Sequence, residues 1–339
     1  METKVINVVV KTQGAEKNVK KLGTSLEDTK KQGKATGVGI SGIFSGITAG
    51  VKSAIPALNA FKGALISTGV GAIVVAVGGL IGIMKSSLSK ATDFAKAMSS
   101  VGAVSGASAE ELSALTQSAK DLGSTTAFTA VQVAELQTEL AKLGFTTSEI
   151  IDATGATLDL AASLDVGLAD AATLAGSTLR SFGLDTTETQ RVVDVLAASA
   201  SSSALDFGSL TESLKLVAPT SRAVGLTIEQ TTAMLGALAN SGLKGSVAGT
   251  GLSKTFIELN KKGLTLEDAF SKINSSSNKL NTAIDLVGVV GAKSLQTLAN
   301  SAGDIDVLTE ALEGAEGSAK QLAETRLDNL AGDTTKLSS

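Results

Sequence analysis

The sequence predicts an all-α protein in which short amphipathic helices form a compact or repeat-like helical domain, preceded by a Gly-rich apolar helical segment and a short N-terminal strand. Three observations lead to this fold class. From residue 93 onward, apolar residues recur three and four positions apart, the spacing of one helix face. A glycine followed by a helix-capping residue returns about every 40 residues in that region. Two runs without any charged residue precede it.

Composition divides the 339 residues into four parts. Residues 1–92 contain 12 Lys, no Arg and 4 acidic residues, a net charge of +8, whereas the remainder carries a net charge of -12. This asymmetry indicates that the two regions meet different surroundings. The lysines fit an anionic membrane surface, or they keep an apolar segment soluble. The predicted parts are a basic strand and amphipathic helix (1–36), a Gly-rich apolar, membrane-like segment (37–92), an all-helical core domain (93–300) and a helical continuation (301–339).

The first part begins with a β-branched run, Lys4–Lys11, that predicts a short strand. The polar stretch after it places Val19, Leu22 and Leu26 on one helix face. So narrow an apolar stripe requires a partner helix or a second copy of itself.

The most apolar stretch, Gly63–Met84, lies between two lysines and carries no charge. As a helix it would be about 33 Å long, close to the thickness of a bilayer's hydrocarbon core. Six of its residues are glycine, which weakens both the helix and its insertion into lipid. The stretch therefore predicts a conditional membrane segment rather than a permanent anchor.

Small residues in these runs are spaced four apart, which places them on one helix face. Such rows let helix backbones approach closely, as in membrane helix dimers. A flexible loop is the alternative, because each glycine costs a helix in water about 1 kcal/mol relative to alanine. The candidate membrane or self-association residues are Gly42, Gly46, Gly50, Gly63, Gly71, Val75, Gly78 and Gly82.

A recurring element organises the core domain: a glycine, an apolar residue, an N-cap residue, two further residues and an acid or Gln. The glycine ends one helix in the left-handed region, and the cap begins the next. Each interval holds about two helices. Two arrangements remain open, a stacked solenoid and a tightly connected domain that uses the same punctuation, of which we favour the second. The copies begin at Gly106, Gly144, Gly183, Gly225 and Gly263.

The composition argues against catalysis. The chain has no Cys, His, Trp or Tyr, which removes the commonest general base, thiolate nucleophiles and the usual zinc ligands. We therefore expect no enzyme activity, no cofactor and no metal site.

Two local motifs need structural interpretations. The run Gly245–Thr255 resembles a phosphate-binding loop, but no glycine precedes Lys254 and no strand precedes the run, so we expect a tight helix connection there. Pro219 is expected to end the helix that begins near Ser209.

Three segments, Lys96–Ser108, Leu115–Ile150 and Leu205–Ser253, closely resemble the core region of phage tail tape-measure proteins. The resemblance covers roughly residues 93–330. It implies a structural virion protein of a tailed phage or prophage, located inside the tail tube, whose length sets tail length. It also implies ejection ahead of the DNA and help for the genome at the host cell membrane.

The partners implied by the resemblance are other copies of the chain in a homo-oligomer, a trimer in the tube; the tail tube protein; distal tail and baseplate proteins; tail assembly chaperones; and the host inner membrane. DNA is implied only as an indirect partner.

A fully helical chain of this length would span only about 510 Å, and no long heptad array is present. We therefore expect an N-terminal portion of a longer protein, with most of the ruler outside it. The alternative function is a membrane pore-forming toxin or channel-like protein built on residues 63–84.

Overall fold

The computed structural model describes residues 89–328. Within this range every regular element is a helix, which confirms the all-α prediction for this part of the chain. The predicted strand Lys4–Lys11 and the stretch Gly63–Met84 lie outside the described residues. The chain divides into two compact units, residues 1–100 with 108–110, and residues 101–107 with 111–339. A helix over residues 89–105 spans the junction in sequence.

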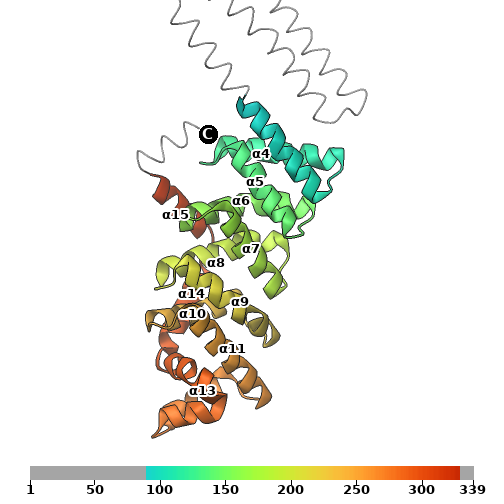
Figure 1. The fold of residues 1–339 in the computed structure, drawn as a ribbon. Helices are drawn as coiled ribbons and strands as arrows, with labels where there is room; N and C mark the ends of the chain where they lie inside the picture. Colours follow the sequence, from blue (N-terminus) through green and yellow to red (C-terminus); the bar gives the residue numbers. More distant parts are fainter. Residues whose placement is uncertain (1–88, 329–339) are drawn as a thin grey trace, which may run out of the picture. The chain divides into compact units, whose positions relative to one another are not determined.

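Twelve α-helices and one short 3-10 helix follow within residues 109–327, and most of them are labelled in Figure 1. They are α4 (Ala109–Thr125), α5 (Ala130–Lys142), α6 (Thr147–Leu164), α7 (Leu168–Phe182), η1 (Thr186–Glu188), α8 (Thr189–Ser202), α9 (Phe207–Ala223), α10 (Ile228–Asn240), α11 (Gly245–Lys261), α12 (Leu266–Ser275), α13 (Lys279–Asn300), α14 (Ala302–Glu313) and α15 (Ser318–Leu327).

The predicted glycine-and-cap element marks the start of each helix pair. All five of its glycines have positive φ, between 61° and 80°. At Gly183, the glycine N–H donates to the Arg180 carbonyl and the next N–H donates to the Leu179 carbonyl. These two bonds form a Schellman motif, which closes a helix and requires the left-handed conformation. The same pair of bonds recurs at Gly144, Gly225 and Gly263.

The cap residues after these glycines act as predicted. Thr146, Thr227 and Thr265 each form a reciprocal capping box with the residue three positions later. Asp185 instead caps the short helix η1 by accepting a bond from the Thr187 N–H. Local sequence therefore determines where these helices begin and end.

Each interval between these glycines contains two helices, and the pairs stack. The second helices of successive pairs, α5, α7, α9, α11 and α13, contact one another in that order and form what we call the second row. The helices α6, α8 and α10 likewise contact one another in order and form the first row. The repeat-like arrangement is therefore a stack of helix pairs, rather than only a set of tight connections (Figure 1).

The C-terminal helices return along the first row. α14 packs against α10 and α8, and α15 packs against α8 and α6. α14 therefore lies beside α10, while α12 packs chiefly against α13. A Cβ at Gly236 of α10 would be in ordinary contact with a Leu308 methyl of α14, at 3.5 Å, and closer to Ser203 after α8, at 3.2 Å.

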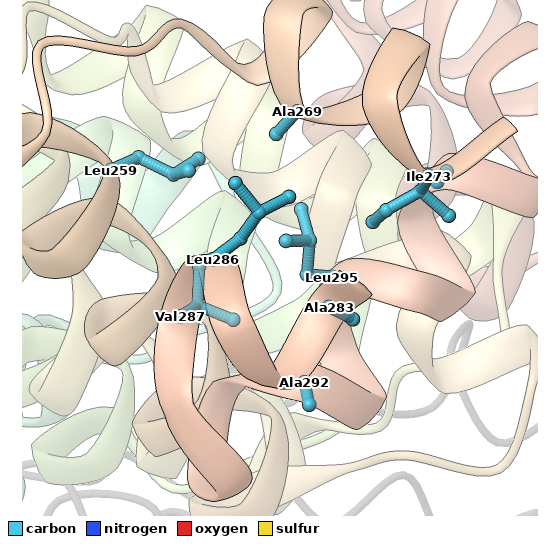
Figure 2. Packing of buried hydrophobic residues seen from close by; sticks show 9 residues of the cluster. Leu259, Ala269, Ile273, Ala283, Leu286, Val287, Ala292 and Leu295 are labelled. Atoms are coloured by element: carbon cyan, nitrogen blue, oxygen red, sulfur yellow. The ribbon is translucent and has the colours of Figure 1, made fainter. Parts of the chain in front are cut away.

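The last helix pair has its own apolar core (Figure 2). Helix α13 bends sharply at Gly288, where φ is 73° and ψ is 172°. Leu286 and Leu295 come from the two sides of this bend and turn toward each other in Figure 2. Leu259 of α11 and Ile273 of α12 complete the same cluster. The glycine bend lets one helix supply two walls of the core.

The prediction that Pro219 ends a helix is wrong. Pro219 lies inside α9, which continues to Ala223. Proline removes one N–H donor from the helix and leaves the carbonyl of Lys215 without it. Both residues lie on the exposed face of α9, where water can hydrate that carbonyl, so the helix tolerates the loss.

Candidate functional site

The eight candidate membrane or self-association residues, from Gly42 to Gly82, all lie outside the described residues, so their grouping stays a prediction. Within residues 89–328, no helix is both long and apolar enough to cross a membrane. The same part of the chain contains no group of three or more carboxylates that could hold a metal ion. The specific polar and close-packed contacts that the structure describes lie between stacked helices.

The glycine-rich run Gly245–Thr255 is not a helix connection, which corrects the prediction. It forms the first turns of α11, and its glycines permit close packing. A Cβ at Gly249 would lie 2.7 Å from the Ser213 carbonyl oxygen of α9, and one at Gly251 would lie 2.1 Å from the Ser294 hydroxyl of α13. The glycines therefore face second-row neighbours on both sides.

Polar bonds hold the same helices in register. The Ser213 hydroxyl of α9 donates to the Gly245 carbonyl at 2.8 Å. The hydroxyls of Thr220 and Ser253 are 2.8 Å apart and share a hydrogen bond. These short side chains reach across only because the helix backbones are close. Helices α9 and α11 therefore form a specific contact rather than a general apolar one.

Arginines in the last turns of two second-row helices reach back to the preceding pair. The Arg180 guanidinium of α7 lies 4.8 Å from the centre of the Phe145 ring, a cation–π contact. The Arg222 guanidinium of α9 lies over Gly183, where a Cβ would come within 2.2 Å of it. Each arginine thus covers the turn that ends the preceding pair and begins its own interval.

An ion pair links the first-row helices α8 and α10. The Arg191 guanidinium donates to Glu229, whose side chain is only 6% exposed, and to Glu188 at 2.7 Å. Burial lowers the pKa of Arg191, but its bonds to the two carboxylates outweigh that effect and hold the pKa above its usual value. A carboxylate as buried as Glu229 needs such a partner.

The most specific polar contact joins α8 to the return helix α15. Asp194 is 1% exposed, and its carboxylate accepts bonds from the N–H groups of Gly317 and Ala319, both at 2.9 Å. Gln190 donates to the same carboxylate at 3.2 Å. α15 has no side-chain cap of its own, so Asp194 supplies one from the first row.

A hollow of about 1000 Å³ lies beside α15 and is lined by residues of α4, α6 and α15. Asp159 of α6 lines it and is half-buried. Burial raises the pKa of Asp159 to about 6, Lys320 opposes that rise, and Asp194 and Glu324 add to it. The hollow is open and lined by both polar and apolar side chains.

Sequence reasoning missed Asp194 and Glu229. The available signal was a charged residue among apolar positions: Val192, Val193, Val195 and Leu196 around Asp194 are all buried. A carboxylate in such a setting requires a partner. The sequence alone does not say that this partner is a helix terminus more than 120 residues away.

Comparison with known proteins adds the following. A family model described as phage-related minor tail protein matches residues 116–332. A tape measure protein of Pneumococcus phage Dp-1 is 31% identical over 280 residues, 74% of this chain and 24% of that protein. A probable tape measure protein of Escherichia phage P2 is 29% identical over 236 residues, 60% of this chain and 29% of that protein. No solved structure matches.

The chain spans about a quarter of the length of these two relatives. The family match nevertheless covers more than half of this chain, from within α4 to beyond α15, and therefore takes in the stack of helix pairs and the return helices. By that match, the chain belongs to the family of phage-related minor tail proteins, which includes phage tail tape-measure proteins.

Proposed function

We propose that the chain acts as a structural tape-measure protein of a tailed phage or prophage. In this proposal it lies in the lumen of the tail tube, templates tail assembly and length, and leaves the tube ahead of the DNA to help the genome cross the host membrane. The observation that carries the proposal is the family match over residues 116–332. No catalytic step, cofactor or metal is part of it.

The described part of the chain is suited to packing rather than to measuring length. Its longest labelled helix has 22 residues and would span about 33 Å if straight. The helix pairs stack side by side, which shortens the chain further. We therefore assign to this domain a role in assembly or delivery, and assign tail length to the protein as a whole.

The proposed partners are those of a tape-measure protein inside a tail tube. They are other copies of the chain, with three copies in one tube, the tail tube protein, distal tail and baseplate proteins, tail assembly chaperones and the host inner membrane. DNA is met only indirectly. The basic charge of residues 1–92 and the charge-free stretch Gly63–Met84 support the membrane part of the proposal.

Quantitative mass spectrometry of purified tails tests the location. Tails should contain the protein in a few copies before ejection, and should lose it after receptor-triggered DNA release. The tail tube protein provides the control, because it stays in place. Absence of the chain from intact tails, or its retention after ejection, would overturn the proposal.

An in-frame deletion of residues 183–224, one helix pair, tests the role of the domain. We expect tail assembly or infection to fail, while any tails that form keep their length. Electron micrographs of negatively stained tails provide the measurement. Tails shortened by about 63 Å, at 1.5 Å per deleted residue, would instead make this domain part of the ruler.

A double substitution, Gly71→Asp with Val75→Asp, tests the membrane role, because two charges would oppose insertion of the apolar stretch. Tails should assemble but fail to deliver DNA. The matched control, Ser86→Asp with Ser87→Asp, adds the same charges just outside the stretch. Normal infection by the first variant would refute the membrane role, and leakage from liposomes caused by the resting chain would favour the pore-forming alternative.

A further inference from the structure

The helix α15 lies close to α6 and α8 but buries few of its side chains. Its only buried residues are Ala319 and Ala323. The preceding helix, α14, buries only Leu312. By contrast, α10 and α11 bury eleven and eight residues. Alanine removes little apolar surface from water, so α15 gains much less from packing than the helices of the rows do.

Hydrogen bonds at the start of α15 compensate for this weak packing. The Asp194 carboxylate of α8 receives the N–H groups of Gly317 and Ala319 at the start of α15. These N–H groups have no partner within α15 itself, because they precede the first complete turn. If α15 leaves the stack, water can hydrate both the carboxylate and the two N–H groups. Opening therefore leaves none of these polar groups without a hydrogen-bond partner.

A second carboxylate opposes the closed position. Asp159 of α6 is half-buried beside α15 and is affected by Lys320 and Glu324 of α15 and by Asp194 of α8. Two further carboxylates line the same hollow, Asp121 from α4 and Asp152 from α6 itself. Lys320 is the cation of this set, and it faces several acids. Burial is the largest cause that raises the pKa of Asp159, ahead of Lys320, which lowers it, and of Asp194 and Glu324, which raise it. An ionised Asp159 that loses water beside α15 therefore destabilises the docked helix, whereas a neutral one does not.

We propose that α15 is a strap that opens and closes on the surface formed by α6 and α8 as a unit, closing in acid and opening toward alkaline pH, while the stacked helix pairs stay folded. The geometry assigns two roles. Asp194 holds the strap closed, and Asp159 makes the closure depend on protonation.

The sign of the pH effect follows from the pKa of Asp159, which burial raises from 3.8 to about 6 in the closed state. A carboxyl group with a raised pKa favours the closed state when protonated, so its full contribution is present below pH 3.8 and is lost as pH rises through 6. Between pH 5 and 8 the opening equilibrium should increase about tenfold.

Hydrogen–deuterium exchange of the full chain tests this, with exposure times corrected for the intrinsic effect of pH. Protection of α15 peptides should fall about tenfold from pH 5 to pH 8, and it should be lower than the protection of α11 peptides at both pH values. Equal protection of α15 and α11 would mean that only global unfolding exposes α15, and would overturn the proposal. A constant protection of α15 across this range would do so as well.

Two variants separate the roles of the carboxylates. Asp159→Asn should keep α15 protected at both pH values, because the amide resembles the neutral acid. Asp152→Asn, a change on the same helix and in the same hollow, should keep the wild-type pH dependence. An unchanged pH dependence in Asp159→Asn would contradict the proposal. If a variant fails to fold, as judged by circular dichroism, the exchange protection of α15 relative to α11 in the wild-type chain still tests whether α15 opens separately.

Discussion

The Asp194 carboxylate accepts the backbone N–H of Ala319 at 2.9 Å, across 125 residues of chain. It also accepts the Gly317 N–H, so one buried side chain on α8 caps a helix that returns from the far end of the stack. This contact makes the C-terminal helices part of the domain. It adds a buried polar contact to the packing of α15 against α6 and α8.

Asp194→Ala should lower the free energy of unfolding by about 2 kcal/mol, since it removes a helix cap and two charge-assisted bonds. Urea denaturation measures the change. The loss is limited because a detached α15 can be hydrated. Asp170→Ala, an acid in the first turn of α7, serves as control and should cost less than about 1 kcal/mol. Equal effects of the two substitutions would argue against a special role for Asp194.

Gly249→Ala should destabilise the domain by about 1–3 kcal/mol, because the new Cβ would lie 2.7 Å from a backbone oxygen of α9 that cannot move aside. Gly303→Ala provides the matched control in α14, where a Cβ would meet nothing within 4 Å. That change should stabilise the protein by about 0.5–1 kcal/mol through helix propensity. Thermal unfolding of the two variants should therefore shift in opposite directions.

These packing glycines show where sequence reasoning stops. The glycines that end helices were predictable, because their neighbours in sequence, an apolar residue and a cap, determine the turn. Gly249 and Gly251 follow no such local pattern. Their role depends on Ser213 and Ser294, which lie in other helix pairs, and the run was therefore mistaken for a connection.

For the rest of the fold and the site, too, features set by neighbouring residues were predictable, and features set by distant residues were not. Helix ends around Thr146, Thr227 and Thr265 follow from local capping chemistry and were predicted. The stacking of pairs and the return of α15 depend on contacts between distant segments. Pro219 was misassigned for a related reason, since its cost depends on whether the freed carbonyl faces water. Neither Asp194 nor Asp159 carries a sequence motif.

Gly183→Ala and Gly225→Ala form a matched pair, because both residues have positive φ but only Gly183 lies under an arginine. Gly225→Ala should cost about 1 kcal/mol, the strain of a left-handed alanine. Gly183→Ala should cost more, because it also displaces Arg222. In an Arg222→Ala background the two costs should become equal. Unequal costs in that background would show that Arg222 is not the cause.

Arg191→Ala should lower the free energy of unfolding by about 2 kcal/mol, because it leaves the buried carboxylate of Glu229 without its cation. Adding Glu229→Gln should restore most of that loss, since a neutral amide needs no counter-charge. Glu188→Gln is the control: Glu188 binds the same guanidinium from an exposed position, so its loss should cost under about 0.5 kcal/mol. Urea titrations of these three variants and of the wild type measure these values. A double variant less stable than Arg191→Ala alone would show that the pair matters through side-chain packing between α8 and α10, not through charge.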